Sequence, residues 1–211
     1  MKCKIHFLII FSTFLLIAVA CDKNTPSNAG ENITNTTKSE IRTDEYTKIS
    51  EKEDLEKKIS QDKNVFKKIQ SSKKYNISAT VTFNHEEDDD RFIYEIVMDN
   101  YTEELKNVIQ SFTLEPSMID YLLTGDLTTT NALNDTETNL KPNKEPFGLS
   151  LFRGYVINKE TINKQITDFY RNMYIKISYG EEENRTEEYW CIEATPSKEI
   201  IDYFNSLENK V

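Results

Sequence analysis

The stretch YNISATVTF at residues 75–83 decides the fold, because apolar and polar side chains alternate along its whole length. Period-2 alternation is the pattern of a strand with one buried face and one solvated face. Further runs rich in β-branched and aromatic residues predict strands at residues 92–98, 108–114, 148–157, 173–179 and 187–194. The sequence therefore predicts a mainly β domain at residues 73–211.

Several links between these predicted strands are too short for parallel crossovers, so most neighbours should run antiparallel. Gly180 lies in the link that makes the last two strands a hairpin. The strands and polar links predict an antiparallel β-sandwich with one or two short helices, at residues 162–169 and 196–207. A small α+β fold, in which both helices cover one face of an antiparallel sheet, is the alternative.

The segment before this domain is strongly charged. Ser50 and Glu53 form a capping-box pair, which predicts a charged amphipathic helix at residues 50–72. Its apolar stripe consists of Leu55, Ile59, Phe66 and Ile69. The preceding residues, 21–49, are rich in Asn and Thr at their start and are predicted to hold the lipid attachment site and a disordered tether.

Residues 1–20 have the pattern of a signal peptide. Lys2 and Lys4 precede an apolar run at residues 7–20, and small residues lead into Cys21. A positive start, a short apolar run and a small-residue cleavage site are typical of secretory signals. The apolar run is shorter than the roughly 20 residues that a spanning helix needs.

The sequence LIAVAC at residues 16–21 resembles the lipobox of bacterial lipoproteins, with Ala18 at the position where leucine is commonest. The resemblance implies that the Cys21 thiol receives a diacylglyceryl group and that the chain is anchored at the outer face of the bacterial cell membrane. Two acyl chains are enough for stable anchoring. Residues 18–20 also satisfy the small-x-small rule of an ordinary signal peptidase, so a secreted protein is the alternative.

The order of residues 94–100, 105–114 and 174–179 resembles immunoglobulin-like domains of bacterial surface lipoproteins. The chain lacks their Cys-Trp-Cys framework, because Cys191 is directly beside Trp190. With Cys3 removed and Cys21 lipidated, Cys191 has no disulfide partner. We expect it to be a small buried hydrophobe without a nearby His or cation to activate its thiol.

An acidic cluster lies between the first two predicted strands, at Glu86, Glu87, Asp88, Asp89 and Asp90. Carboxylates on a loop can bind a hard cation such as Ca²⁺, so this cluster is a candidate weak cation site. Consecutive side chains of an extended segment point in opposite directions, so all five cannot converge. A solvated hairpin tip is the competing interpretation.

The composition argues against several classes of function. The net charge is -10 over the whole chain, and from residue 75 onward 26 acidic residues face 12 basic ones, which argues against a nucleic-acid partner. His85 is the only histidine after the predicted signal peptide, and no serine lies in a Gly-x-Ser-x-Gly elbow. No catalytic residue, zinc site or cofactor is predicted.

These features predict a noncatalytic binding module on a membrane-anchored lipoprotein, with another cell-envelope protein or a cell-wall component as its partner. A carboxylate-dependent cell-wall glycan hydrolase and a small-ligand-binding lipoprotein are the alternatives. The long loop at residues 124–146 is a candidate partner-binding surface. Phe147, Phe152 and Tyr155 after it are predicted core residues, and outward-facing ones among them would mark an interface.

Overall fold

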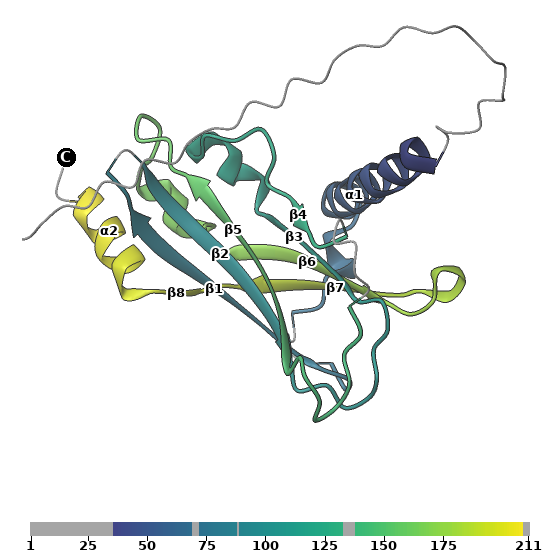
Figure 1. Ribbon diagram of the computed structural model, residues 1–211. Helices are drawn as coiled ribbons and strands as arrows, with labels where there is room; N and C mark the ends of the chain where they lie inside the picture. Colours follow the sequence, from purple (N-terminus) through teal and green to yellow (C-terminus); the bar gives the residue numbers. More distant parts are fainter. Residues whose placement is uncertain (1–35, 69–71, 88, 133–137, 209–211) are drawn as a thin grey trace, which may run out of the picture. The chain divides into compact units, whose positions relative to one another are not determined.

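The computed structural model describes residues 36–208 except 69–71, 88 and 133–137, and side chains from residue 47. Residues 35–211 form one compact unit. The described chain is mainly β, as predicted, and has two four-stranded sheets (Figure 1). One sheet has the order β5-β2-β1-β8, with bounds Gly148–Val156, Asp90–Asp99, Asn76–His85 and Thr195–Pro196. The other has the order β4-β3-β6-β7, with bounds Thr129–Thr130, Ile109–Leu114, Asn172–Tyr179 and Thr186–Glu193.

All six predicted strands are present, and the two short strands β4 and β8 were not predicted. Every strand pair is antiparallel except the two-residue pairing of β1 with β8. In the β1–β2 hairpin, Ile77 lies opposite Met98 and Val81 opposite Tyr94. These four side chains are buried, so the alternation in residues 75–83 sets which face of this sheet meets the core.

The main core lies between the inner faces of the two sheets. One sheet contributes the alternate residues of β2, and the other contributes residues from β3, β6 and β7. Buried side chains of these strands in the core include Phe92, Tyr94, Ile96, Met98, Phe112, Ile175, Ile177 and Trp190. The Tyr94 hydroxyl donates a hydrogen bond of 2.7 Å to the backbone oxygen of Tyr170, which satisfies a buried polar group.

Helix α1 spans Thr36–Gln61, so the helix predicted at residues 50–72 was placed wrongly at both ends. Residues 36–49, predicted as tether, are helical because neither Gly nor Pro interrupts them. The helix ends where the Asp62 side chain accepts a hydrogen bond of 3.0 Å from the Asn64 backbone N–H and caps the 3₁₀ turn η1 at Lys63–Val65. No helix within the described residues is long and apolar enough to cross a membrane.

The later helices are shorter than predicted. Helix α2 spans Lys198–Glu208, and Ser197 precedes it with its hydroxyl 3.4 Å from the Ile200 N–H. Pro196, predicted as the first helical residue, lies in β8 instead. The helix predicted at residues 162–169 is the 3₁₀ turn η3 at Lys164–Asp168. Two further 3₁₀ turns are η2 at Pro116–Tyr121 and η4 at Glu182–Asn184.

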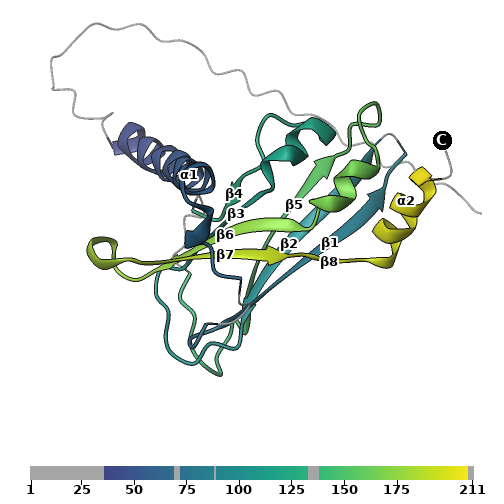
Figure 2. The same cartoon turned by 180° about the vertical axis from the view of Figure 1, so that it is seen from behind.

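The outer faces of the two sheets differ. Helix α1 lies beside β3, β4 and β6, and both β3 and β6 are buried on both faces (Figure 2). We call this sheet the covered sheet. Strand β2 instead alternates between buried and half-buried residues, and β5 has every second residue exposed along most of its length. We call the β5-β2-β1-β8 sheet the open sheet.

Candidate functional site

A lysine is buried beneath α1 on the outer face of the covered sheet. The side chain of Lys176 is only 5% exposed, and its Nζ lies 3.1 Å from Glu51, 3.1 Å from Asp54 and 2.8 Å from Glu187. The Tyr189 hydroxyl lies 2.6 Å from Asp54 and 2.8 Å from Glu187, and it can donate its one proton to either. We call these five residues the Lys176 cluster.

Burial opposes the charges of Lys176 and Asp54, yet the hydrogen bonds and ion pairs within the cluster outweigh this effect. Burial alone would lower the pKa of Lys176, but the hydrogen bond to Glu187 and the charges of Glu51 and Asp54 raise it above 10.5. Burial would raise the pKa of Asp54, but hydrogen bonds from Tyr189 and Lys176 bring it below 3.8. Lys176 and Asp54 are therefore both charged at neutral pH, and the cluster holds α1 on the covered sheet.

The sequence did not reveal this cluster, although one signal was present. Lys176 stands between Ile175 and Ile177 in a strand of mostly apolar residues, where a charged side chain must find buried partners. Those partners come from α1, whose position could not be read from local sequence. None of the three carboxylates lines the pocket beside Cys191 or the pocket between α1 and η2.

The most exposed large apolar side chains lie along β5. Phe147 precedes the strand and is 65% exposed, and Phe152 at its middle is 68% exposed. Leu123 is 62% exposed, and its backbone N–H donates a hydrogen bond of 2.9 Å to the oxygen of Val156 at the far end of β5. We call these three apolar residues the β5 strip. They are spread over about 30 Å of chain, given the rise of about 3.3 Å per strand residue.

The predicted burial of Phe147 and Phe152 was wrong, and that of Tyr155 is confirmed. Phe152 lies opposite Glu95 of β2 on the outer face, whereas Tyr155 lies opposite Phe92 on the inner face. Residues three apart on a strand face opposite sides, so a sheet with one buried face can bury only one of this pair.

The surroundings of the β5 strip are only partly polar. Ile93 and Val97 of β2 are half-buried on the same outer face as Phe152. Within the loop at residues 124–146, Leu127 and Leu140 are buried in the core. The Arg153 guanidinium donates to the backbone oxygen of Thr128 at 2.6 Å, which ties this loop to β5. The described parts of the loop therefore support the strand beside it.

The acidic cluster lies where β1 turns into β2, and its carboxylates have partners within the chain. Asp90 is paired with His85 and Lys159, at 2.5 and 3.2 Å. Burial would raise the pKa of Asp90, but hydrogen bonds from His85 and Lys159 lower it. Glu86 and Asp89 lie 3.5 and 3.7 Å from the Arg91 guanidinium.

These contacts give the acidic cluster a structural role. Glu87 is exposed, and Asp88 lies outside the described residues. No group of three or more His, Cys, Asp or Glu side chains in the described part of the chain is arranged to hold a metal ion. Cation binding at this turn stays a prediction.

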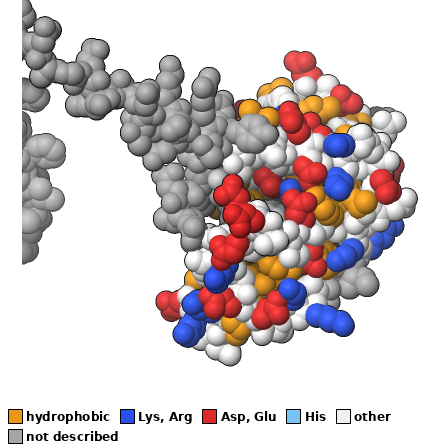
Figure 3. Space-filling view, turned by 90° about the vertical axis from the view of Figure 1, so that its right-hand side faces the viewer, with side chains coloured by type: hydrophobic (Ala, Val, Ile, Leu, Met, Phe, Trp, Pro, Cys, Tyr) orange, Lys and Arg blue, Asp and Glu red, His pale blue; other side chains and the backbone are white. Residues whose placement is uncertain are grey.

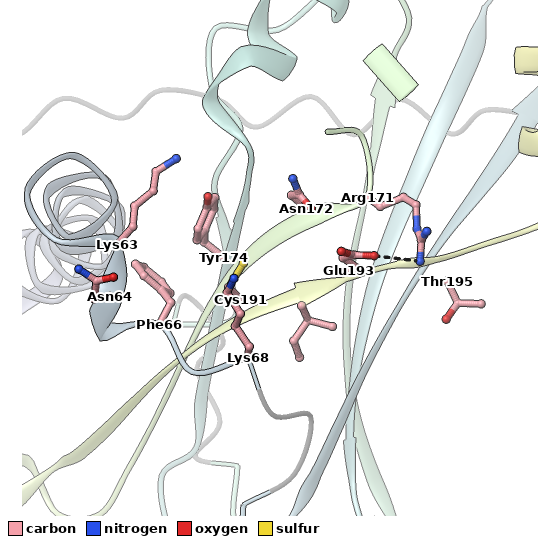
Figure 4. Close-up of a pocket in the computed structure, with 11 residues that line it drawn as sticks. Lys63, Asn64, Phe66, Lys68, Arg171, Asn172, Tyr174, Cys191, Glu193 and Thr195 are labelled. Carbon is pink, nitrogen blue, oxygen red and sulfur yellow. Dashed lines mark ion pairs between the residues drawn. The ribbon is translucent and has the colours of Figure 1, made fainter. Parts of the chain in front are cut away.

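A pocket of about 670 Å³ opens between η1 and the ends of β6 and β7 (Figure 4). It is lined by Lys63, Asn64, Phe66, Lys68, Arg171, Asn172, Tyr174, Cys191, Ile192, Glu193 and Thr195. We call it the basic pocket. The Cys191 thiol is half-buried, and burial raises its pKa although Lys68 and Lys63 act to lower it. The prediction that no cation lies near this thiol was therefore wrong.

Surface charge is mixed on the face that includes α1. Figure 3 shows acidic and basic side chains interspersed there, with apolar patches between them. The strong net negative charge from residue 75 onward therefore does not form one continuous acidic surface on this face.

Comparison of the chain with protein-family models, with curated proteins and with solved structures finds no significant match. The sites described above therefore depend on the geometry of this chain alone. Cys21 and the segment that resembles a lipobox lie outside the described residues. Lipidation and cellular location stay predictions.

Proposed function

We propose that this chain is a membrane-anchored extracytoplasmic lipoprotein whose β domain is a noncatalytic binding module. The LIAVAC segment at residues 16–21 supports anchoring through Cys21 at the outer face of the bacterial cell membrane. The two packed sheets support the coarser prediction of a sandwich. Its immunoglobulin-like character is part of the proposal.

The observation that carries the binding role is the β5 strip. Six large apolar residues of the described chain are exposed, and the three that exceed 60% exposure lie in β5 or beside one of its ends. Single apolar side chains are ordinary on a surface, but Phe152 shares the outer face with the half-buried Ile93 and Val97, and apolar side chains grouped in this way are typical of an interaction site. Aromatic residues contribute much of the binding energy of protein interfaces. We therefore propose another cell-envelope protein as the partner.

A glycan hydrolase would need two carboxylates facing a substrate cleft. The converging carboxylates of the Lys176 cluster surround an ammonium group beneath a helix, and this supports a structural role for them. No specific observation favours hydrolysis.

Anchoring is tested by labelling cells that express the full chain with an alkyne analogue of a fatty acid. We expect label and membrane association in the unaltered protein, and loss of both in Cys21→Ser. Cys191→Ser is the matched control and should keep both. Label that persists in Cys21→Ser would contradict lipid attachment at this residue.

Binding is tested by quantifying the envelope proteins crosslinked to the full chain in intact cells. We expect Phe152→Ser to remove the main crosslinked species, since it deletes the centre of the β5 strip. Ile49→Ser, at an exposed residue of α1, is the control and should leave that species unchanged. Equal crosslinking in both variants would contradict a role for the strip.

A further inference from the structure

The basic pocket concentrates positive charge in a domain that is otherwise acidic. Lys63, Lys68 and Arg171 line it, and Glu193 is the one acidic residue among the lining side chains. In the close-up, Lys63 lies on one side and Arg171 on the other, with Cys191 between them (Figure 4). The lining side chains therefore have an excess of two positive charges, and two of the three cations, Lys63 and Lys68, come from the segment before residue 75.

Two of the three cations are held in place by the fold. The Arg171 Nε donates a hydrogen bond of 3.0 Å to the backbone oxygen of Ala194, and one terminal nitrogen lies 3.3 Å from Glu193. Lys63 lies 3.3 Å from Glu115 and 5.2 Å from the centre of the Tyr174 ring. These contacts orient both cations before any ligand arrives, which lowers the entropic cost of binding.

The third cation has no such partner. Lys68 is exposed and forms no ion pair within the described residues. Its charge acts to lower the pKa of the Cys191 thiol, and both residues line the pocket, so the ammonium group lies on the same side of the pocket as Cys191. An anion entering the pocket would therefore meet one unpaired ammonium group and one guanidinium group.

Apolar side chains form the rest of the wall. The rings of Phe66 and Tyr174 pack edge to face with centres 5.0 Å apart, and Ile192 lies beside them in the lining. Asn64 and Asn172 add neutral hydrogen-bonding groups. A volume of about 670 Å³ is in the range of small-molecule sites, which combine apolar walls with a few polar groups that fix orientation.

We propose that the basic pocket binds a small organic anion. Its carboxylate or phosphate group is held by Lys68 and Arg171, and its apolar part lies against Phe66 and Tyr174. Guanidinium groups bind such anions through charge-assisted hydrogen bonds. The anion competes with Glu193 for Arg171. This site lies on η1, β6 and β7, so it is separate from the β5 strip.

The test uses residues 35–211, which form one compact unit and contain Cys191 as their only cysteine. Phenyl phosphate and benzoate are the probes, and phenol is the matched compound without charge. Binding is measured from the backbone amide signals of residues 63–68 and 191–195, and from the rate at which iodoacetamide alkylates Cys191. We expect saturable shifts and slower alkylation with at least one of the two anions, and neither effect with phenol at the same millimolar concentration.

Three variants distinguish specific binding in the basic pocket from a general attraction of anions to positive charge on the protein. Lys68→Ala should weaken binding about tenfold or more, because it removes a charge-assisted contact. Glu193→Gln should strengthen binding, because it removes the group that competes for Arg171. Lys198→Ala, at an exposed lysine of α2, is the control for net charge and should change little.

The proposal is overturned if neither anion produces saturable shifts at millimolar concentration. It is also overturned if Lys198→Ala weakens binding as much as Lys68→Ala does, or if Glu193→Gln leaves the affinity unchanged. Thermal unfolding of each variant shows that a loss of binding is not a loss of fold.

Discussion

The covered and open sheets are built from strands of similar length, yet their outer faces differ. On β6 of the covered sheet, even the lysine at position 176 is buried beneath α1. On β5 of the open sheet, Phe152 is 68% exposed. A charged side chain is thus inside and an aromatic side chain outside, which reverses the usual preference of both residue types.

This contrast separates the part of the fold that holds α1 from the surface that we propose for binding. The outer face of the covered sheet holds α1 through ion pairs centred on the buried Lys176. The open sheet leaves its outer face unoccupied in the described chain and presents the β5 strip. Changes beneath α1 should therefore affect stability, and changes on the open sheet should affect binding.

The largest effect is expected from Lys176→Ala, because it leaves three carboxylates together without their ammonium partner. Breaking a buried ion pair typically costs about 3–5 kcal/mol. Lys159→Ala removes a lysine whose side chain is 55% exposed, and its partner Asp90 on the open sheet keeps His85, so this change should cost about 1 kcal/mol or less. Urea unfolding of residues 35–211 measures both. Equal costs would remove the distinction between the two sheets.

Leu55→Ala tests the apolar part of the contact between α1 and the covered sheet. Leu55 is fully buried, so its truncation should cost about 2–5 kcal/mol. Ile49→Ala, at an exposed residue of the same helix, should cost less than about 0.5 kcal/mol. Hydrogen exchange of the α1 amides, together with thermal unfolding, reports the change. A tolerated Leu55→Ala would mean that α1 does not depend on this contact.

Low pH should weaken the attachment of α1 to the covered sheet. The pKa of Asp54 is lowered in the folded protein, so its contribution to stability is present above 3.8 and is lost as the pH falls through the lowered value. The raised pKa of Lys176 keeps its contribution present below 10.5, and that contribution is lost only as the pH rises through the raised value.

The amide exchange of α1, measured as a function of pH, tests the predicted loss of stability in acid. We expect faster exchange in α1 below pH 3.8, before the core strands respond. In the Asp54→Asn variant, the α1 amides should exchange faster at neutral pH, and their exchange should change less as the pH falls. An α1 whose protection does not change across this range would contradict the role of Asp54.

The sequence predicted the strands well because their period-2 pattern is local. The bounds of α1 could not be predicted in the same way. Residues 36–49 are mostly polar and give no clear periodic signal. The next part of the helix is held by Lys176, which lies more than a hundred residues further along the chain. The orientation of Phe152 could have been predicted from the sequence. Its spacing of three from Tyr155 implies that the two rings face opposite sides of the strand.

The smallest effect on stability is expected on the open sheet. Phe152→Ser should change the free energy of unfolding by less than about 0.5 kcal/mol, because the ring is already in solvent. Phe92→Ala, a buried aromatic residue of the same sheet, should cost about 3–5 kcal/mol. Urea unfolding compares the two. A large cost for Phe152→Ser would mean that the ring supports the fold.

Photo-crosslinking in intact cells tests the central claim, that the open sheet is the binding surface, most directly. A photoreactive amino acid replaces Phe152 in the full chain, and in a second variant it replaces Ile201, an exposed apolar residue of α2. We predict a discrete crosslinked envelope protein from position 152 and none from position 201. The account is contradicted if position 152 yields no crosslink, or if both positions yield the same species equally.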